Sequence, residues 1–112
     1  MPEIIRIKIK NKTLRIKNCK GFSSFRGLMF DNLSDKDGAL IYGNSIWMPF
    51  VRCDLDLLFL DKNFQIIDVQ RAVPLSLNRE TWKIYKNKHA KYCLEIKAGL
   101  ERFQKGQKIN FI

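Results

Sequence analysis

Apolar and basic residues alternate one by one near the start of the chain, and this alternation is the feature that most constrains the fold. The odd positions from 5 to 9 are isoleucine, the even positions from 6 to 10 are arginine or lysine, and the pattern resumes around Leu14 and Ile16. Successive side chains of a strand point to opposite faces of a sheet. The pattern therefore predicts a hairpin over residues 4–18 that turns at Asn11-Lys12, with one apolar and one basic face.

Further apolar segments predict two more hairpins. Residues 39–42 and 46–48 flank Gly43-Asn44-Ser45, and glycine and asparagine supply the positive φ angles that tight turns need. Residues 55–60 are apolar on both faces, with Leu55, Leu57 and Phe59 on one face and Leu58 and Leu60 on the other. This pattern predicts a buried strand at the centre of a sheet. A turn at residues 61–63 then leads into a partner strand over 64–69.

Long helical periodicity is absent from the chain. A short helix over residues 25–29, capped by Ser23 or Ser24, and a helical turn near 100–104 are the helical segments that we predict. Strands are predicted over residues 92–97 and 107–112. The chain of 112 residues is thus expected to form a mainly β (α+β) fold, a compact single domain whose barrel-like sheet is built of hairpins with one or two short helices.

The charge is strongly basic, at a formal +10 with a sequence pI near 9.8. Two regions concentrate it, and the candidate nucleic-acid contacts in them are Arg6, Lys8, Lys10, Arg15 and Lys17 on the hairpin, and Lys83, Lys86 and Lys88 in a later segment with Arg79 and Lys91. The later segment also holds Trp82, Tyr85 and Tyr92. Basic groups neutralise phosphates and aromatic rings stack on bases, which predicts single-stranded nucleic-acid binding. The alternative is a surface that only keeps the protein in solution.

Four short blocks carry a resemblance to a known family. They are Arg26-Gly27-Leu28-Met29-Phe30, Ile46-Trp47-Met48, Leu55-Asp56-Leu57-Leu58-Phe59-Leu60-Asp61 and Leu94-Glu95-Ile96-Lys97-Ala98-Gly99. In this order and spacing they resemble the signature of the family catalogued as domain of unknown function 192, over residues 20–112. The resemblance implies a fold more than a function, because the family has no established activity. Pro49 and Phe50 stand where the family pattern usually has a polar pair.

A ligand pocket is the leading functional prediction. Asp56 lies among apolar neighbours, and a buried carboxylate needs a partner or a raised pKa. Arg26 is the basic residue of the first block, and its guanidinium could bind the carboxylate through two parallel hydrogen bonds. The pair is either a structural ion pair or part of a pocket, lined by Trp47, Met48 and Phe59, for a small ligand or peptide. We therefore predict a non-catalytic binding module, with the nucleic-acid binder as the alternative.

Catalytic and metal-binding patterns are missing from the sequence. It has no glycine-rich phosphate loop, no zinc-protease helix motif and no serine nucleophile elbow. Asp54 and Asp56 would share a strand face that Asp61 does not, which argues against a three-carboxylate site. No catalytic residue, metal or cofactor is predicted. Glu95 is expected on the wetter face of its strand.

The cysteines and the amino terminus indicate a reducing compartment. Cys19, Cys53 and Cys93 are far apart, His89 is the one histidine, and we expect ordinary buried or half-buried thiols. Residues 4–9 are interrupted by charges, unlike a signal peptide, and no apolar segment is long enough to span a bilayer. We expect a cytoplasmic protein of unknown oligomeric state, although the family resemblance implies exported relatives.

Overall fold

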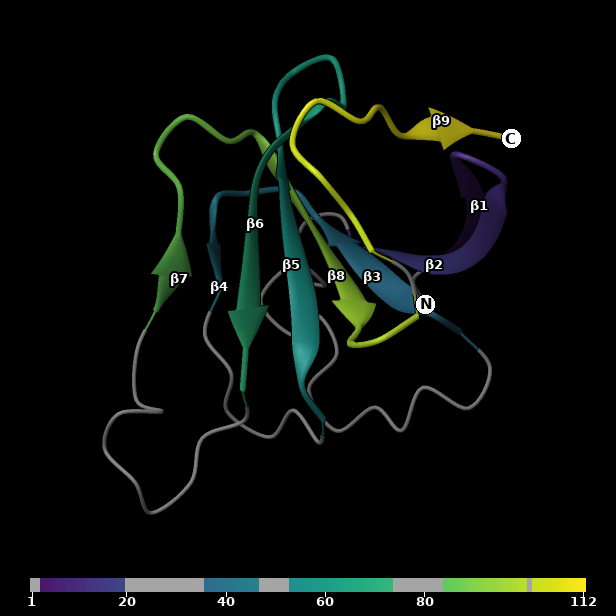
Figure 1. Cartoon of the computed structure of the whole chain (residues 1–112), viewed down its shortest axis with the longest axis horizontal. Helices are drawn as coiled ribbons and strands as arrows, with labels where there is room; N and C mark the ends of the chain where they lie inside the picture. Colours follow the sequence, from purple (N-terminus) through teal and green to yellow (C-terminus); the bar gives the residue numbers. More distant parts are fainter. Residues whose placement is uncertain (1–2, 20–35, 47–52, 74–83, 101) are drawn as a thin grey trace.

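The computed structural model describes residues 3–19, 36–46, 53–73, 84–100 and 102–112, and these residues form strands and no helix (Figure 1). The prediction of a mainly β domain is confirmed. The strands are β1 (Glu3–Ile9), β2 (Lys12–Cys19), β3 (Gly38–Ile41), β4 (Ser45–Ile46), β5 (Leu55–Leu60), β6 (Ile66–Ala72), β7 (Tyr85–Lys86), β8 (Tyr92–Lys97) and β9 (Asn110–Phe111).

Seven of these strands form one curled sheet in the order β6-β5-β8-β3-β2-β1-β9, and β4 and β7 form a small second sheet. The β2–β3 pair is parallel and the other neighbours are antiparallel. Near the C-terminus, Ile66 N–H donates to Gln107 O at 2.8 Å and Ile109 N–H donates to Phe64 O at 2.9 Å. The same segment continues into β9 beside β1, so it links the two ends of the sheet into a half-barrel (Figure 1).

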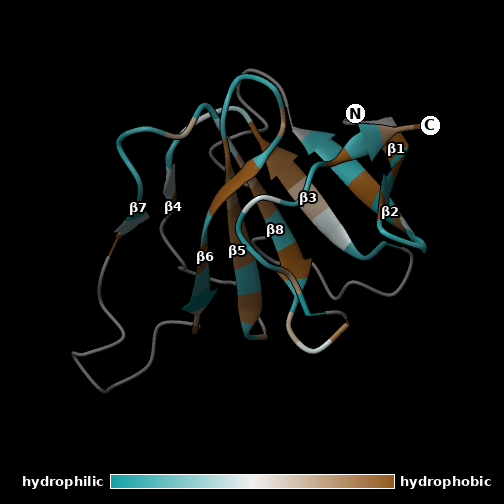
Figure 2. Cartoon of the chain, turned by 45° about the horizontal axis from the view of Figure 1, so that its top comes forward, coloured by the Kyte–Doolittle hydropathy of each residue, from teal (hydrophilic) through white to brown (hydrophobic). Residues whose placement is uncertain are grey.

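The first hairpin forms as predicted. Strands β1 and β2 pair from Glu3–Asn18 to Ile9–Lys12, and Arg6 lies directly opposite Arg15. The turn is at Lys10 and Asn11, one residue earlier than expected, and Lys10 has a positive φ of 53°. The alternation of apolar and polar residues along both strands is visible in Figure 2.

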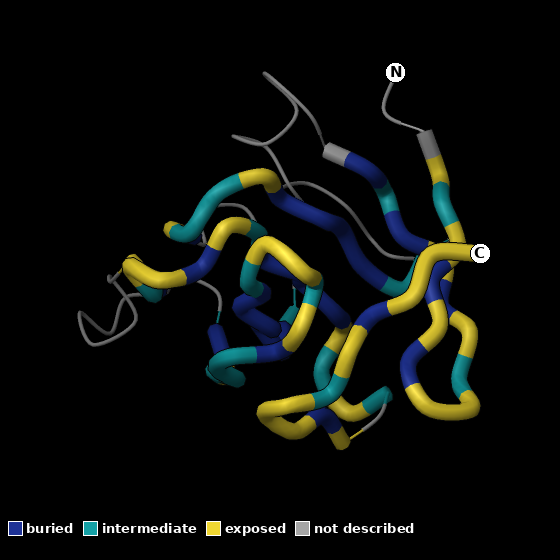
Figure 3. Tube along the Cα trace, turned by 90° about the horizontal axis from the view of Figure 1, so that it is seen from above, coloured by how far each residue is buried: buried dark blue, intermediate teal, exposed yellow. Residues whose placement is uncertain are grey.

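Two apolar cores lie on opposite faces of the curled sheet. The inner face is enclosed by the curl and consists of Ile7, Ile9, Leu14, Ile16, Leu40, Leu58, Leu60, Ile66, Leu94, Ile96, Phe103 and Ile109. The outer face consists of Ala39, Ile41, Ile46, Leu55, Leu57, Phe59, Ala72, Tyr85, Ala90 and Cys93. Residues from the small β4–β7 sheet therefore pack on the outer face. The buried strands form the dark centre of the trace in Figure 3.

The strand predicted to be the most buried is confirmed. All six residues of β5 are buried, with the two predicted faces turned to the two cores. The predicted third hairpin, β5–β6, also forms. Its turn is held by Asp61, whose Oδ1 accepts N–H bonds from Asn63 at 2.8 Å and from Gln65 at 3.0 Å.

The second predicted hairpin is wrong. Strand β3 pairs with β2 and β8, whereas β4 pairs with β7. The physical reason is burial: every residue of β3 is buried, so this strand needs a neighbour on each side within the sheet. The residues 42–44 carry the chain away from the sheet instead of folding it back.

The predicted helical turn near 100–104 is also wrong for the described residues 100 and 102–104, where a hydrogen-bonded turn joins Gln104 and Gln107. The short helix predicted over 25–29 lies outside the described residues. The Cα radius of gyration is 12.9 Å, close to the ~13 Å of a compact domain of about 100 residues. In the described part of the chain, no helix combines the length and the apolar character needed to cross a bilayer.

Candidate binding sites

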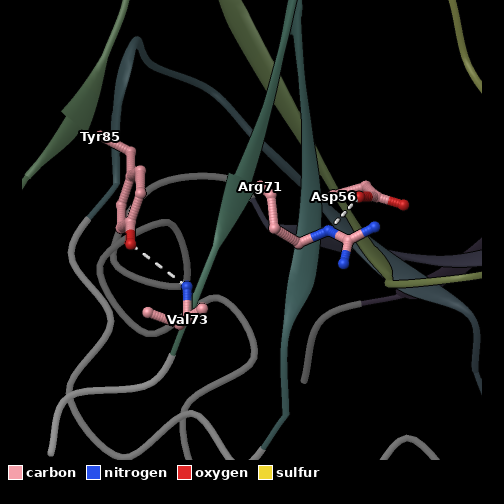
Figure 4. A network of polar contacts seen from close by, with 4 residues as sticks. All are labelled: Asp56, Arg71, Val73 and Tyr85. Atoms are coloured by element: carbon pink, nitrogen blue, oxygen red, sulfur yellow. Dashed lines mark hydrogen bonds and ion pairs between the residues drawn. The ribbon is translucent and has the colours of Figure 1, made fainter. Parts of the chain in front are cut away.

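Asp56 pairs with an arginine, but with one that the sequence analysis did not name. Arg71 lies directly opposite it on β6, and Arg71 Nε donates to Asp56 Oδ1 at 2.8 Å (Figure 4). The Asp56 side chain is 12% exposed and that of Arg71 is 58% exposed. The predicted partner Arg26 lies outside the described residues. In the described part of the chain, Asp56 is thus a carboxylate at the rim of the inner core with its charge matched by Arg71.

Of the other predicted pocket residues, Phe59 is the one within the described part of the chain, and it does not lie beside Asp56. Trp47 and Met48 lie outside the described residues. Phe59 is fully buried in the outer core, whereas Asp56 is on the opposite side of β5. Side chains three residues apart on a strand point to opposite faces, so Asp56 and Phe59 cannot line one cavity. The described geometry of Phe59 is that of a packing residue.

A hollow opens beside the Asp56–Arg71 pair. Its volume is about 380 Å³, and its walls are Asp56, Val69, Arg71, Gly99, Arg102 and Phe103. Gly99 follows β8 with a φ of +88°, a left-handed conformation that favours glycine. Lys12 Nζ donates to Leu100 O at 2.6 Å, which ties the loop after β8 to the first hairpin. Among the described residues, the hollow is therefore lined by two arginines, one carboxylate and an apolar wall.

The basic residues of the first hairpin gather on one surface. Arg6, Lys8, Lys10 and Arg15, here called the basic face, are exposed and alternate with the inner-core residues of their strands. None of these four side chains is paired with a described carboxylate; Asp37 Oδ2 accepts a bond from the backbone N–H of Arg15, at 2.8 Å. Lys17 is half-buried further along β2 and lies beside Ala39.

The later basic segment is only partly described. Lys86 and Lys88 are exposed, whereas Lys83, Arg79 and Trp82 lie outside the described residues. Tyr85 is 3% exposed, and its hydroxyl accepts a bond from Val73 N–H at 3.2 Å (Figure 4). Its ring therefore belongs to the outer core and has no face to offer a nucleic-acid base.

A row of four aromatic rings was missed by the sequence analysis, apart from Tyr92. Ring centroids are 5.4 Å apart for Tyr42–Tyr92, 4.5 Å for the stacked Phe64–Tyr92 pair and 4.8 Å for Phe64–Phe111. The ends of the row are exposed, Tyr42 by 40% and Phe111 by 46%. Its members come from four distant parts of the chain, and each follows or precedes a turn or a strand end. Proximity to a turn or a strand end is the one local feature by which these residues could have been singled out from the sequence.

Glu95 is buried, and its expected place on a wetter face is wrong. It is 3% exposed and stands between Ala39 and Leu57 of the outer core. Its Oε1 has no hydrogen-bond partner among the described residues. Burial raises the pKa of Glu95 to about 8, an effect that the positive charge of Lys17 partly opposes. The prediction from the alternation of polar and apolar residues was wrong here because apolar cores cover both faces of β8.

The thiols are placed as expected where they are described. Cys93 is fully buried and Cys53 is half-buried. Burial, followed by the charge of Glu95, raises the pKa of the Cys93 thiol, which keeps it protonated.

Comparison with known proteins identifies a family and a fold. The model of domain of unknown function 192, described as an uncharacterized ACR, matches residues 5–111. A protein from Sinorhizobium meliloti 1021, named as a candidate transcription regulator, superposes with a TM-score of 0.83 at 20% identity, over 98% of this chain and 95% of that one. A protein of unknown function from Novosphingobium aromaticivorans DSM 12444 superposes with a TM-score of 0.77 at 18% identity, over 96% of this chain and 84% of that one. No curated protein matches. At these identities the solved structures show a shared fold.

Proposed function

Because this chain belongs to the domain of unknown function 192 family, which has no established activity, we propose its function from its own surface: it is a non-catalytic module that binds single-stranded nucleic acid. One observation carries the proposal. Arg6 and Arg15 are directly opposite each other on an exposed strand pair, beside Lys8 and Lys10, with no described carboxylate paired to any of the four side chains.

The electrostatics of this face favour an anionic partner. Like charges directly opposite each other on neighbouring strands are destabilising. A phosphate group placed between the two guanidinium groups would turn this repulsion into two attractions, and arginine binds phosphate through two parallel hydrogen bonds. The net charge of +10 also raises the rate at which a polyanion meets the surface.

The aromatic row supports a single strand over a duplex. Stacking on an aromatic side chain requires bases whose faces are free, and it contributes about 1–3 kcal/mol per base. Phe111 is on β9, the strand next to β1, and it pairs with Ile7 while Asn110 pairs with Lys8. Because Phe111 pairs with the inner-core residue Ile7, its ring lies on the face opposite to Lys8, and a nucleic-acid strand held at Lys8 would cross the edge of β9 to reach it. Three exposed lysines lie near the row: Lys62 is two residues before Phe64 in the sequence, Lys91 directly precedes Tyr92, and Lys108 pairs with Gln65, the residue after Phe64.

The small-ligand or peptide pocket around Arg26, Trp47, Met48, Asp56 and Phe59 remains a prediction. Three of these residues lie outside the described part of the chain, and the other two are on opposite faces of β5. The later segment with Lys83, Lys86 and Lys88 likewise remains a predicted second contact.

Affinity measured against salt tests the proposal. Labelled single-stranded RNA, single-stranded DNA and duplex DNA are titrated with the protein by fluorescence anisotropy at several salt concentrations. Each neutralised phosphate of a single strand contributes a slope of about −0.7 in log affinity against log salt. The Lys8→Glu/Arg15→Glu variant should bind single strands much more weakly, with a slope shallower by about 1.4 if two contacts are lost.

The matched control is Lys97→Glu/Lys105→Glu, which makes the same change in net charge at two exposed lysines outside the basic face. It should keep most of the affinity. Equal losses in the two variants would mean that net charge alone attracts the oligonucleotide, and undetectable binding near physiological salt would overturn the proposed function.

A further inference from the structure

A second binding site is suggested where β5, β6 and the segment after β8 meet, at residues that belong neither to the basic face nor to the aromatic row. The hollow of about 380 Å³ beside Asp56 and Arg71 lies within the usual size range of small-molecule sites, ~300–1,000 Å³. We infer that this hollow binds a small organic anion, a molecule with one carboxylate and an apolar body.

The first step concerns the guanidinium of Arg71. Its one ion pair in the described residues uses Nε, which donates to Asp56 Oδ1. This bond fixes the plane of the guanidinium and leaves the fork of its two terminal nitrogens for another acceptor. A carboxylate matches that fork through two parallel hydrogen bonds.

The second step concerns charge. Among the described residues, the ionisable side chains that line the hollow are Arg71, Arg102 and Asp56. Asp56 pairs with Arg71, and Arg102 adds a second guanidinium to the wall. Two guanidinium groups beside one carboxylate favour an anion over a cation.

The third step concerns the apolar wall. Val69 and Phe103 line the same hollow, and both belong to or pack against the inner core. A flat apolar group can cover them while the carboxylate points to Arg71. Lys12, through Leu100 O, and the left-handed Gly99 hold the loop that carries Arg102 and Phe103. The site is thus framed before any ligand arrives, which lowers the cost of binding.

Nuclear magnetic resonance with a matched pair of probes tests this inference. Benzoate and its neutral analogue benzamide are added to the isotope-labelled protein at constant ionic strength, and the Nε resonance of Arg71 and the amides of Gly99 and Phe103 are followed. Benzoate should shift these signals in a saturable way, and benzamide should not. Inorganic phosphate, added in a third series, should compete with benzoate, because it carries the charge without the apolar body.

The benzoate affinities of three arginine variants test whether benzoate binds in the hollow. Arg71→Gln should weaken benzoate binding by at least about tenfold, because the charge-assisted fork is lost. Arg102→Gln should weaken it less, and Arg6→Gln, at an exposed arginine of the basic face, should leave it unchanged. Arg71 is more than half exposed, and glutamine keeps an amide N–H₂ that can donate to Asp56, so this replacement should preserve the fold.

Unchanged affinity in Arg71→Gln, or shifts that never saturate, would overturn the inference. The oligonucleotide titration of the same Arg71→Gln protein separates the two proposals. Normal oligonucleotide binding with lost benzoate binding supports two independent sites, and failure of either site leaves the test of the other intact.

Discussion

Gly38 lies so close to the backbone carbonyl of Glu95 that no side chain fits between them. A Cβ built on Gly38 would overlap this oxygen and would also press on Cα of Ile96 at 3.1 Å. Gly38 begins β3 and pairs with Ile96 on β8, so the close approach belongs to the contact between two interior strands. The glycine is required by space, because its φ is not in the left-handed range.

Replacement of Gly38 by alanine should therefore destabilise the fold. The added methyl group meets backbone, which cannot rotate aside, and overpacking of this kind costs about 1–3 kcal/mol. Urea unfolding measures the loss. Gly43→Ala is the matched control, because a Cβ there meets nothing within 4 Å and φ is not positive; its stability should change little. Equal stability of the two variants would contradict the close approach.

The buried carboxyl of Glu95 should make the protein less stable as the pH rises. The pKa of Glu95 is about 8 in the folded chain, against 4.5 for a solvent-exposed glutamate such as that of the unfolded chain. The folded state therefore binds more protons between these values, so the free energy of unfolding falls from about pH 4.5 to pH 8 and then levels off. The full shift corresponds to at most about 5 kcal/mol, and a loss of a few kcal/mol is expected.

Glu95→Gln should remove most of this fall, because glutamine does not ionise. Urea unfolding at pH 5, 6.5 and 8 checks it, with Asp54→Asn as the control at an exposed carboxylate. A Glu95→Gln protein that keeps the pH dependence of the unmodified protein would show that another group causes it.

Truncation of Phe59 should test its place in the outer core. Phe59 is fully buried, and replacement of such a ring by alanine costs about 3–5 kcal/mol. Phe111→Ala removes a ring that is 46% exposed and should cost much less. Thermal unfolding compares the two. A Phe59→Ala protein as stable as Phe111→Ala would contradict the packing role of Phe59.

The two exposed ends of the aromatic row should contribute to oligonucleotide affinity. Tyr42→Ala and Phe111→Ala should each weaken binding of single-stranded DNA by about 1–3 kcal/mol per lost stacking contact. The salt slope should stay the same, because no phosphate contact is removed. Leu replacements at the same positions retain apolar volume without a flat ring, and they should also bind weakly. Full affinity in both alanine variants would remove the row from the proposed interface.

The sequence predicted the elements whose partners are near in the chain. The β1–β2 and β5–β6 hairpins and strand β8 follow from alternation, from apolar runs and from local turn residues. The position of β3 did not follow, because its parallel contact with β2 and its contact with β8 are set by burial of the whole sheet. The turn residues Gly43 and Asn44 predicted that β3 pairs with β4, whereas β3 pairs with β2 and β8.

The partner of Asp56 shows why the site was harder to predict than the fold. The β5–β6 register shifts between Phe59 and Leu60. A hairpin without this shift would put Gln70 opposite Asp56, whereas the shifted register puts Arg71 there. A change of one residue in register thus exchanges a neutral partner for a charged one. The aromatic row and the burial of Glu95 likewise depend on contacts between distant strands.

The binding position of a short oligonucleotide tests the central claim most directly. A titration of the labelled protein with a single-stranded thymidine oligonucleotide, followed by nuclear magnetic resonance, reports which backbone amides and side chains change. The account predicts the largest changes along β1 and β2 at Arg6, Lys8 and Arg15, with further changes at Tyr42 and Phe111. Changes confined to Arg71, Gly99 and Phe103, or spread evenly over the surface, would contradict it.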